Sequence, residues 1–212
     1  NDASAMLENS KNAATDGADA LLLVTPYYNK ATDLGLERSF LSIADKTDLP
    51  IILYNVPSRT GVDIPVPVYR SLAEHENIVA VKEASGNIGK IAEIIAETDG
   101  KLGVYSGNDD QTVPVMSLGG IGVISVLSNI MPRETVEMCR ACLAGKTDVA
   151  AKRQLDLLPL IKSLFLEVNP IPVKTALAVM RMCREEFRLP MCEMNEANKI
   201  GLIRLMKKYK LI

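Results

Sequence analysis

Histidine is scarce in this sequence: a single copy, His75, stands among 212 residues. Sites that need two histidines, such as the HExxH zinc motif, are therefore excluded, and a Ser-His-Asp triad would have to use His75. Because His75 follows Glu74 near the end of a predicted helix, we expect it at the surface. The four cysteines are too few for a disulfide scaffold, which favours a reducing compartment.

The chain also lacks long apolar runs and a surplus of either charge. No run reaches the roughly 18 residues that cross a bilayer, and no basic-then-apolar signal segment opens the chain. With a formal net charge of −2, the sequence lacks the surplus of basic residues that a general nucleic-acid binder carries. We therefore expect a cytoplasmic protein with no membrane or nucleic-acid partner, whose 48% of apolar residues can build a sizeable core.

What the sequence does contain is a regular alternation of short apolar runs and amphipathic stretches. Each run has 4–5 nearly continuous apolar residues, which is typical of strands buried on both faces of a parallel sheet. The predicted strands are 20–24, 51–54, 78–81, 102–105 and 122–126, and the predicted helices are 1–15, 34–46, 65–74, 87–97 and 109–118. This order predicts an α/β fold with right-handed crossovers, which both doubly wound sheets and (β/α)8 barrels satisfy.

The pattern changes after residue 128, where helices follow one another. They are expected over 131–144, 148–166, 171–186 and 195–209. Pro159 should kink or split the second of them, because proline cannot donate the helical hydrogen bond. We therefore predict a βα domain over residues 1–146 and a helical domain over residues 147–212.

Two short motifs imitate known sites. The run Gly119-Gly120-Ile121-Gly122 precedes a strand, whereas a dinucleotide fingerprint follows one, so a tight turn is the better interpretation. Cys139 and Cys142 have CxxC spacing but lie within a predicted helix, where a pair of buried thiols is the better interpretation.

Reactive side chains gather where the predicted strands end, which is the functional edge of α/β folds. Lys82 closes a buried apolar strand, and desolvation there would favour a neutral amine able to attack a carbonyl carbon. Tyr54 closes the preceding strand and could relay protons. Arg59, in the loop after Tyr54, could hold a substrate carboxylate. The alternative is that Lys82 reaches solvent and pairs with Glu83.

Five stretches of the chain, taken together, resemble the dihydrodipicolinate synthase and N-acetylneuraminate lyase superfamily of pyruvate-dependent class I aldolases. They are Val24–Asn29, Leu53–Gly61, Val81–Asn87, Gly122–Val126 and Asn169–Lys174. The arginine within the second stretch favours the synthase branch. The resemblance implies a reaction between pyruvate and aspartate semialdehyde toward diaminopimelate and lysine, with no metal and no organic cofactor.

The resemblance also implies a role for each residue of the strand ends. Lys82 would form the Schiff base with pyruvate, Tyr54 would relay protons beside it, and Arg59 would bind the carboxylate of the semialdehyde. The backbones of Gly107 and Ile124 would line the pyruvate pocket.

Further residues of the resemblance point to a subunit interface. Tyr28 would reach the site of a neighbouring subunit across a tight dimer. Asn1 and Tyr27 match positions of a lysine feedback site, but Ala5 replaces its glutamate, so we expect weak or no inhibition by lysine. Other open alternatives are an N-acetylneuraminate lyase-like aldolase and a catalytically silent fragment that associates with itself.

By the same resemblance, the five predicted strands correspond to strands four to eight of a (β/α)8 barrel, followed by C-terminal helices. The first three βα units, roughly 80 residues, would be missing, together with a Gly-Thr-Thr-Gly-Glu loop that contributes to the proton relay. Open parallel edges and an apolar inner face would then favour a homodimer or a higher homo-oligomer.

Overall fold

The computed structural model describes all 212 residues, Asn1–Ile212. It divides into two compact units, the first made of residues 1–108 and 114–124 and the second of residues 109–113 and 125–212. None of its helices combines the length and the apolar character that crossing a membrane requires.

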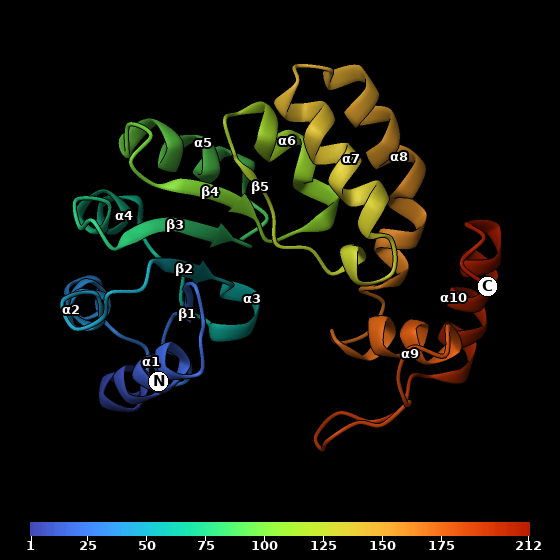
Figure 1. The fold of residues 1–212 in the computed structure, drawn as a ribbon, viewed down its shortest axis with the longest axis horizontal. Helices are drawn as coiled ribbons and strands as arrows, with labels where there is room; N and C mark the ends of the chain where they lie inside the picture. The colour runs from blue at the N-terminus through green and yellow to red at the C-terminus, as the bar shows by residue number, and fades with distance from the viewer. The chain divides into compact units, whose positions relative to one another are not determined.

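The first unit contains one parallel sheet with the strands in sequential order (Figure 1). The strands are β1 (Leu21–Val24), β2 (Ile51–Asn55), β3 (Ile78–Glu83), β4 (Gly103–Ser106) and β5 (Gly122–Val123). A doubly wound sheet reverses its strand order at one point, and this sheet does not. The predicted α/β fold with a parallel sheet is thus confirmed, and its winding is that of barrel folds.

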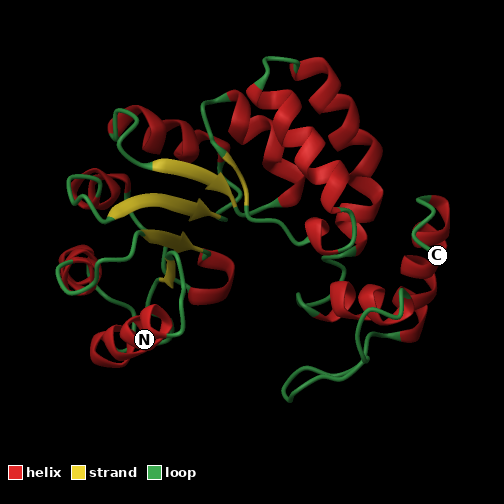
Figure 2. Ribbon diagram, in the orientation of Figure 1, coloured by secondary structure: helices red, strands yellow, loops and turns green.

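Helices cover one face of this sheet (Figure 1; Figure 2). They are α1 (Ala3–Thr15), α2 (Asp33–Ala44), α4 (Val66–Leu72) and α5 (Ile88–Glu97), while α3 (Pro57–Thr60) is a single turn after β2. Alternate strand residues face the helices and form the core with them. Its central members are Leu21, Leu23, Ile51, Leu53, Val81 and Val104 from the strands, and Leu36, Phe40, Tyr69, Leu72, Ile91 and Ile94 from the helices.

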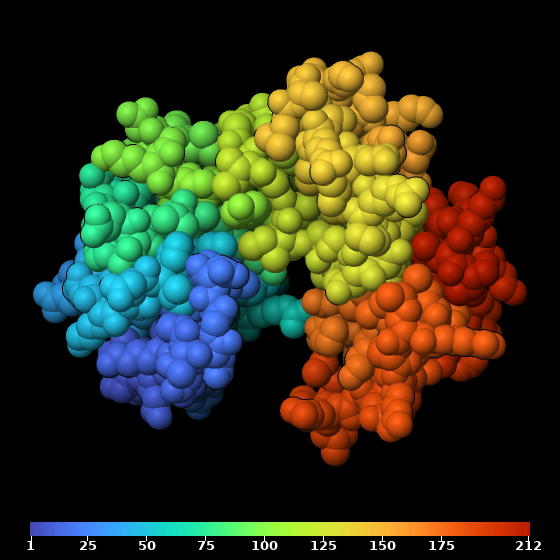
Figure 3. All heavy atoms as spheres, in the orientation of Figure 1, coloured from blue at the N-terminus to red at the C-terminus, as the bar shows by residue number.

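The second unit is helical. It contains a 3-10 turn at Asp109–Gln111, the first residues of α6 (Thr112–Ser117), a second 3-10 turn at Leu127–Asn129, and α7 (Pro132–Leu143), α8 (Thr147–Ser163), α9 (Ile171–Val179) and α10 (Glu196–Lys208). Helices α7 and α8 lie side by side (Figure 1; Figure 3). A core that includes Leu127, Leu160 and Leu202 joins the turn at 127–129 to α8 and α10. The boundary predicted after residue 146 stays a prediction.

Pro159 does not split α8, which runs unbroken to Ser163. Proline removes the hydrogen bond to the carbonyl four residues earlier, which belongs to Leu155. Because Leu155 is 67% exposed, that end of the missing bond lies on the solvent side of the helix. The expected split of the helix is therefore wrong.

The helix predicted over 171–186 is also shorter, because α9 ends at Val179. The chain reverses at Arg181, which has a φ of 63°. Glu185 then accepts a hydrogen bond from Thr175 Oγ1 at 3.2 Å and pairs with Lys199 Nζ at 2.7 Å. The segment after Val179 is thus held by contacts with α9 and α10 rather than by helical hydrogen bonds.

The strand predicted over 122–126 likewise stops early, since β5 ends at Val123. Asp109 Oδ2 accepts hydrogen bonds from the backbone N–H groups of Val126 (2.9 Å) and Leu127 (3.0 Å). These bonds draw the chain into the 3-10 turn at 127–129 instead of a longer strand.

His75 is less exposed than predicted. Its side chain is 20% exposed, Nε2 lies 3.2 Å from Asp45 Oδ1, and Nδ1 accepts the N–H of Asn77. The glycine run, by contrast, forms the expected turn: Gly119 has a φ of +106°, and the N–H of Gly120 donates to Val115 O.

Candidate active site

The register of the sheet places Lys82 between two tyrosines. Tyr54 of β2 and Tyr105 of β4 are the direct neighbours of Lys82 of β3. Directly paired residues of parallel strands point to the same face, here the face away from the helices. Lys82 Nζ lies 4.2 Å from the centroid of the Tyr54 ring. The structure therefore brings together the two residues that the strand ends predicted.

The environment of Tyr54 favours a protonated hydroxyl. Burial raises the pKa of Tyr54 above its ordinary value of 10.0, and the positive charge of Arg59 offsets part of this rise. At neutral pH the hydroxyl therefore carries its proton and can donate it to a group held beside Lys82. The effect of Arg59 on this pKa also means that its guanidinium lies close enough to influence the Tyr54 hydroxyl.

Arg59 is held by a short turn after β2. Pro57 begins the single-turn helix α3, where its missing N–H is no disadvantage, and Gly61 ends it with a φ of 66°. A side chain at Gly61 would meet Lys30, since its Cβ would lie 3.2 Å from Lys30 Cε and 3.5 Å from Nζ. Two cations, Arg59 and Lys30, thus belong to this corner, and both suit a carboxylate ligand.

The backbones of Gly107 and Ile124 have their amide groups engaged. The N–H of Gly107 donates to Glu83 O at 2.8 Å, and the N–H of Ile124 donates to Ser106 O at 2.9 Å. A Cβ at Gly107 would lie only 2.5 Å from that of Ala84, so no side chain fits there. These two residues can therefore offer carbonyl oxygens, but not amide donors, to a ligand.

Glu83 is held on the helix-facing side of the sheet, away from Lys82. Its side chain is fully buried and accepts hydrogen bonds from Asn55 Nδ2 (3.0 Å to each oxygen), Tyr69 Oη (2.7 Å) and the N–H of Ser85 (2.8 Å). Pairing of Lys82 with Glu83, the alternative considered for the sequence, is not the arrangement found.

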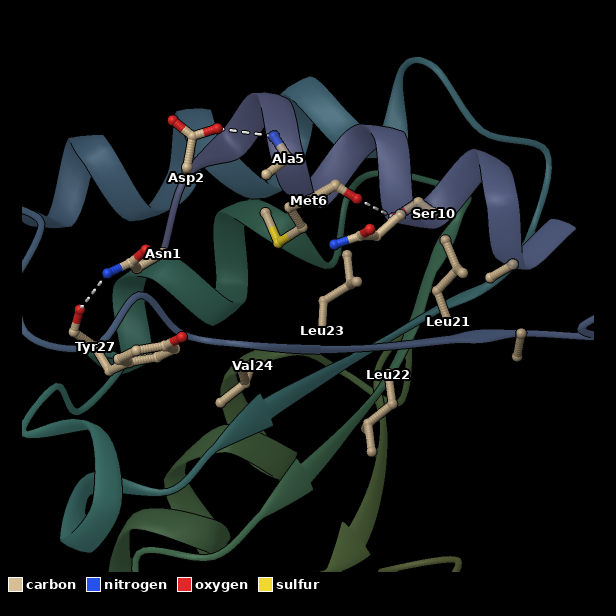
Figure 4. A pocket seen from close by; sticks show the side chains of 13 residues that line it. Asn1, Asp2, Ala5, Met6, Ser10, Leu21, Leu22, Leu23, Val24 and Tyr27 are labelled. Carbon is tan, nitrogen blue, oxygen red and sulfur yellow. Dashed lines mark hydrogen bonds between the residues drawn. The ribbon is translucent and has the colours of Figure 1, made fainter. Parts of the chain in front are cut away.

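The residues of the predicted interface lie near the start of the chain. Tyr28 is 94% exposed and has a φ of 67°. Asn1 Nδ2 donates to Tyr27 O at 3.3 Å and to Asn29 Oδ1 at 2.8 Å. Figure 4 shows Asn1, Tyr27 and Ala5 at a hollow of about 450 Å³ between α1 and β1. The structure thus brings Asn1 and Tyr27 together.

No metal centre is suggested by the side chains. No three of the His, Cys, Asp and Glu residues form a group that could hold an ion. Cys139 and Cys142 are free thiols in α7, and burial raises the pKa of each above its ordinary value, so they remain protonated at neutral pH. The two cysteines lie in a helix, as the sequence predicted, but they are partly rather than fully buried.

Reasoning from the sequence missed two parts of this region. Tyr105 was not singled out, although it stands two residues before Gly107 and lies on the same face of the sheet as Lys82. Asn55 and Tyr69, which hold Glu83, were also missed. The position of Asn55 directly after Tyr54 was the available signal, because alternation turns it to the opposite face.

Comparison with protein families identifies the chain's relatives. The model of the family described as dihydrodipicolinate synthetase matches residues 1–209. The 4-hydroxy-tetrahydrodipicolinate synthase of Clostridium tetani is 51% identical over 203 residues, which are 95% of this chain and 68% of that protein. The synthase of the same name from Lachnoclostridium phytofermentans is 53% identical over 204 residues, or 96% of this chain and 69% of that protein.

Solved structures give the same relationship. The dihydrodipicolinate synthase from Aquifex aeolicus matches with a TM-score of 0.97 at 45% identity, over 100% of this chain and 72% of that chain. The one from Thermotoga maritima matches with a TM-score of 0.98 at 39% identity, over 100% of this chain and 73% of that chain. Because the family match spans nearly all residues and the relatives share about half of them, the chain belongs to the dihydrodipicolinate synthetase family.

Proposed function

We propose that this protein is a Schiff-base lyase that condenses pyruvate with L-aspartate 4-semialdehyde, in the synthesis of diaminopimelate and lysine. The observation that carries the proposal is the position of Lys82 Nζ, 4.2 Å over the ring of Tyr54, at the carboxyl edge of a parallel sheet. The synthase name of the relatives supports this substrate pair. It favours neither a sialic-acid-type aldolase nor a silent fragment.

The reaction begins at Lys82. Its neutral amine attacks the C2 carbonyl carbon of pyruvate, and loss of water leaves a Schiff base. Removal of a C3 proton gives an enamine, whose carbon forms a bond with the aldehyde carbon of the semialdehyde while the aldehyde oxygen takes a proton. The amino group of the semialdehyde then attacks the Schiff-base carbon, which closes the ring and releases the Lys82 amine.

The neighbouring residues divide the remaining tasks. Tyr54 carries protons to and from the reacting oxygen and nitrogen atoms, because its hydroxyl stays protonated at neutral pH. Arg59 binds the carboxylate of the semialdehyde through its planar guanidinium. The carbonyl oxygens of Gly107 and Ile124 line the pyruvate pocket, and no step requires a metal or an organic cofactor.

The family also supports a proposal for the fold and assembly of the enzyme. The sheet of the first unit forms part of a (β/α)8 barrel, residues 1–146 belong to that barrel domain, and residues 147–212 form a C-terminal helical domain. The protein acts in the cytoplasm as a homodimer or a higher homo-oligomer. Tyr28, with 94% of its surface exposed, contributes to the site of a neighbouring subunit, and Asn1 and Tyr27 remain from an effector site.

Trapping of the Schiff base tests the central step. The protein is incubated with pyruvate and sodium borohydride, and the product is examined by intact mass and peptide mapping. A reduced pyruvyl adduct on Lys82 is expected, followed by turnover with the semialdehyde in a coupled assay. A folded protein with no adduct, or with an adduct elsewhere, contradicts the proposal. Arg59→Ala should raise KM for the semialdehyde while the adduct still forms.

A further inference from the structure

Directly beneath the pair Tyr54 and Lys82, on the helix-facing side of the sheet, lies the pair Asn55 and Glu83. The register matches Tyr54 with Lys82 and Asn55 with Glu83. Glu83 and Asn55 are both completely buried. A fully buried carboxylate is costly unless donors surround it, so its presence next to the reactive lysine requires an explanation.

The hydrogen bonds around Glu83 fit an ionised carboxylate. All three partners, Asn55 Nδ2, Tyr69 Oη and the N–H of Ser85, are donors. Burial, together with the charge of Glu83, holds the pKa of Tyr69 well above its usual value, so the phenol keeps the proton that it donates. The network is therefore complete at neutral pH.

The same residues connect the ends of three strands. The N–H of Ala84 donates to Asn55 O at 2.9 Å, and the N–H of Gly107 donates to Glu83 O at 2.8 Å. The Asn55 side chain also reaches the loop before α4, where its Oδ1 accepts the N–H of Ile64 at 3.1 Å. The backbone of Glu83 is thus bonded to Gly107, while its carboxylate is connected through Asn55 to the end of β2 and to the loop before α4.

We propose that Glu83 is a positioning residue for the Schiff-base reaction: its buried carboxylate, held by Asn55, Tyr69 and Ser85, fixes the orientation of Lys82 over Tyr54. The proposal rests on the proposed function of Lys82. Misplacement of a nucleophile by about 1 Å can cost two orders of magnitude in rate, so loosening this anchor should slow the chemistry more than it affects binding.

Two variants of Glu83 separate length from charge. Glu83→Gln keeps the length of the side chain but cannot accept all three donors, and Glu83→Asp keeps the charge but falls one methylene short. The rate constant for the borohydride-trapped adduct at saturating pyruvate should fall about tenfold or more in both. The pyruvate concentration for half-maximal rate should change less than the rate constant.

A matched control comes from the residue that caps the C-terminus of α5. Thr98 is 2% exposed, and its hydroxyl donates to Ile94 O at 2.8 Å, with no bond to any residue that binds Glu83. Thr98→Val removes one buried hydrogen bond without touching the network, and should leave the adduct rate as in the unchanged protein. Adduct rates equal to that of the unchanged protein in the folded Glu83 variants would overturn the proposal. If neither Glu83 variant folds, the adduct rate of Tyr69→Phe, which removes only one donor to Glu83, replaces theirs. A rate equal to that of the unchanged protein would again overturn the proposal.

A second measurement makes the result independent of pyruvate. Trace acetic anhydride labels lysines in proportion to their reactivity, and Lys101, whose side chain is 51% exposed, serves as the internal reference. The ratio of labelling at Lys82 to labelling at Lys101 is measured at a series of pH values. We expect this ratio to change about threefold or more in Glu83→Gln and to stay the same in Thr98→Val. If the unchanged protein forms no adduct, the proposed function fails, yet this ratio still decides whether Glu83 positions Lys82. An unchanged ratio overturns the inference.

Discussion

The two faces of the five-stranded sheet have opposite characters. On the side of the helices, Leu23, Leu53 and Val81 are 8% exposed or less and belong to one core. On the other side, Tyr54, Lys82 and Tyr105 are only partly buried. Because successive residues of a strand alternate between faces, one short run supplies both a packing residue and a reactive one.

The difference teaches where stability and chemistry are located in this unit. Burial of aliphatic side chains on the helix face stabilises the sheet, while the other face carries the groups to which the proposed reaction assigns the transfer of protons and the Schiff base. Asn55 and Glu83 differ from these aliphatic residues, since they are polar and completely buried on the helix face. Their place under Tyr54 and Lys82 couples the two faces, and the predictions below test how separate the faces are.

The largest effect is expected from Lys82→Ala. The yield of the reduced pyruvyl adduct should fall by at least about a thousandfold, because no other side chain supplies the nucleophile. The free energy of unfolding should change by no more than about 1 kcal/mol, since Lys82 is only partly buried. Lys101→Ala, at an exposed lysine, is the control and should keep the adduct. Equal adduct yields in both variants would contradict the assignment of Lys82.

The next effect is on stability and lies on the other face. Leu53→Ala removes a completely buried side chain and should lower the free energy of unfolding by about 2–5 kcal/mol. Ile52→Ala, one residue earlier on the partly buried face, should cost about 1 kcal/mol. Urea titration of both variants measures the comparison. Similar losses would mean that the two faces contribute equally to stability.

A smaller effect on the rate is expected from Tyr54→Phe. Removing the phenolic proton should slow adduct formation by about a hundredfold, in the range of general acid–base catalysis, with little change in stability. Tyr105→Phe is the matched comparison, because Tyr105 flanks Lys82 on the opposite side. Equal reductions in the two variants would contradict a specific proton relay through Tyr54.

The strands and the position of the lysine could be predicted because they depend on local pattern. Continuous apolar runs of 4–5 residues predicted five strands, and the positions of Tyr54 and Lys82 at the ends of adjacent runs predicted that they would meet. The winding could not be chosen, because doubly wound and barrel sheets share the same βα pattern. Strand order, which depends on contacts between distant residues, decided it.

Two of the errors arise where a distant side chain ends an element. Asp109 ends β5 through the amides of Val126 and Leu127, and no pattern within 122–126 carries that information. Glu185 similarly binds Thr175 and Lys199, so that α9 stops at Val179. Partners remote in sequence also explain why the buried network of Glu83 was missed.

The smallest effect concerns pH and the link between the two faces. The pKa of Tyr69 is raised well above its ordinary value of 10.0 by burial and by the charge of Glu83. An unfolded chain therefore loses this proton at a lower pH than the folded protein does. The contribution of Tyr69 is complete below pH 10 and is lost as the pH rises toward the folded value, by about 1.4 kcal/mol per pH unit.

Tyr69→Phe should reduce the alkaline slope by the contribution of Tyr69, because phenylalanine has no proton to lose. The slope from Tyr54, Cys139 and Cys142, whose pKa values are also raised in the folded protein, should remain. Leu72→Val is the control, since it shortens a completely buried side chain in the same helix and leaves the phenol in place. It should lower stability by about 1 kcal/mol at every pH and keep the alkaline slope. Urea titrations between pH 8 and about 11 measure both. An unchanged slope in Tyr69→Phe would show that the buried phenol and Glu83 do not govern the alkaline stability of this sheet.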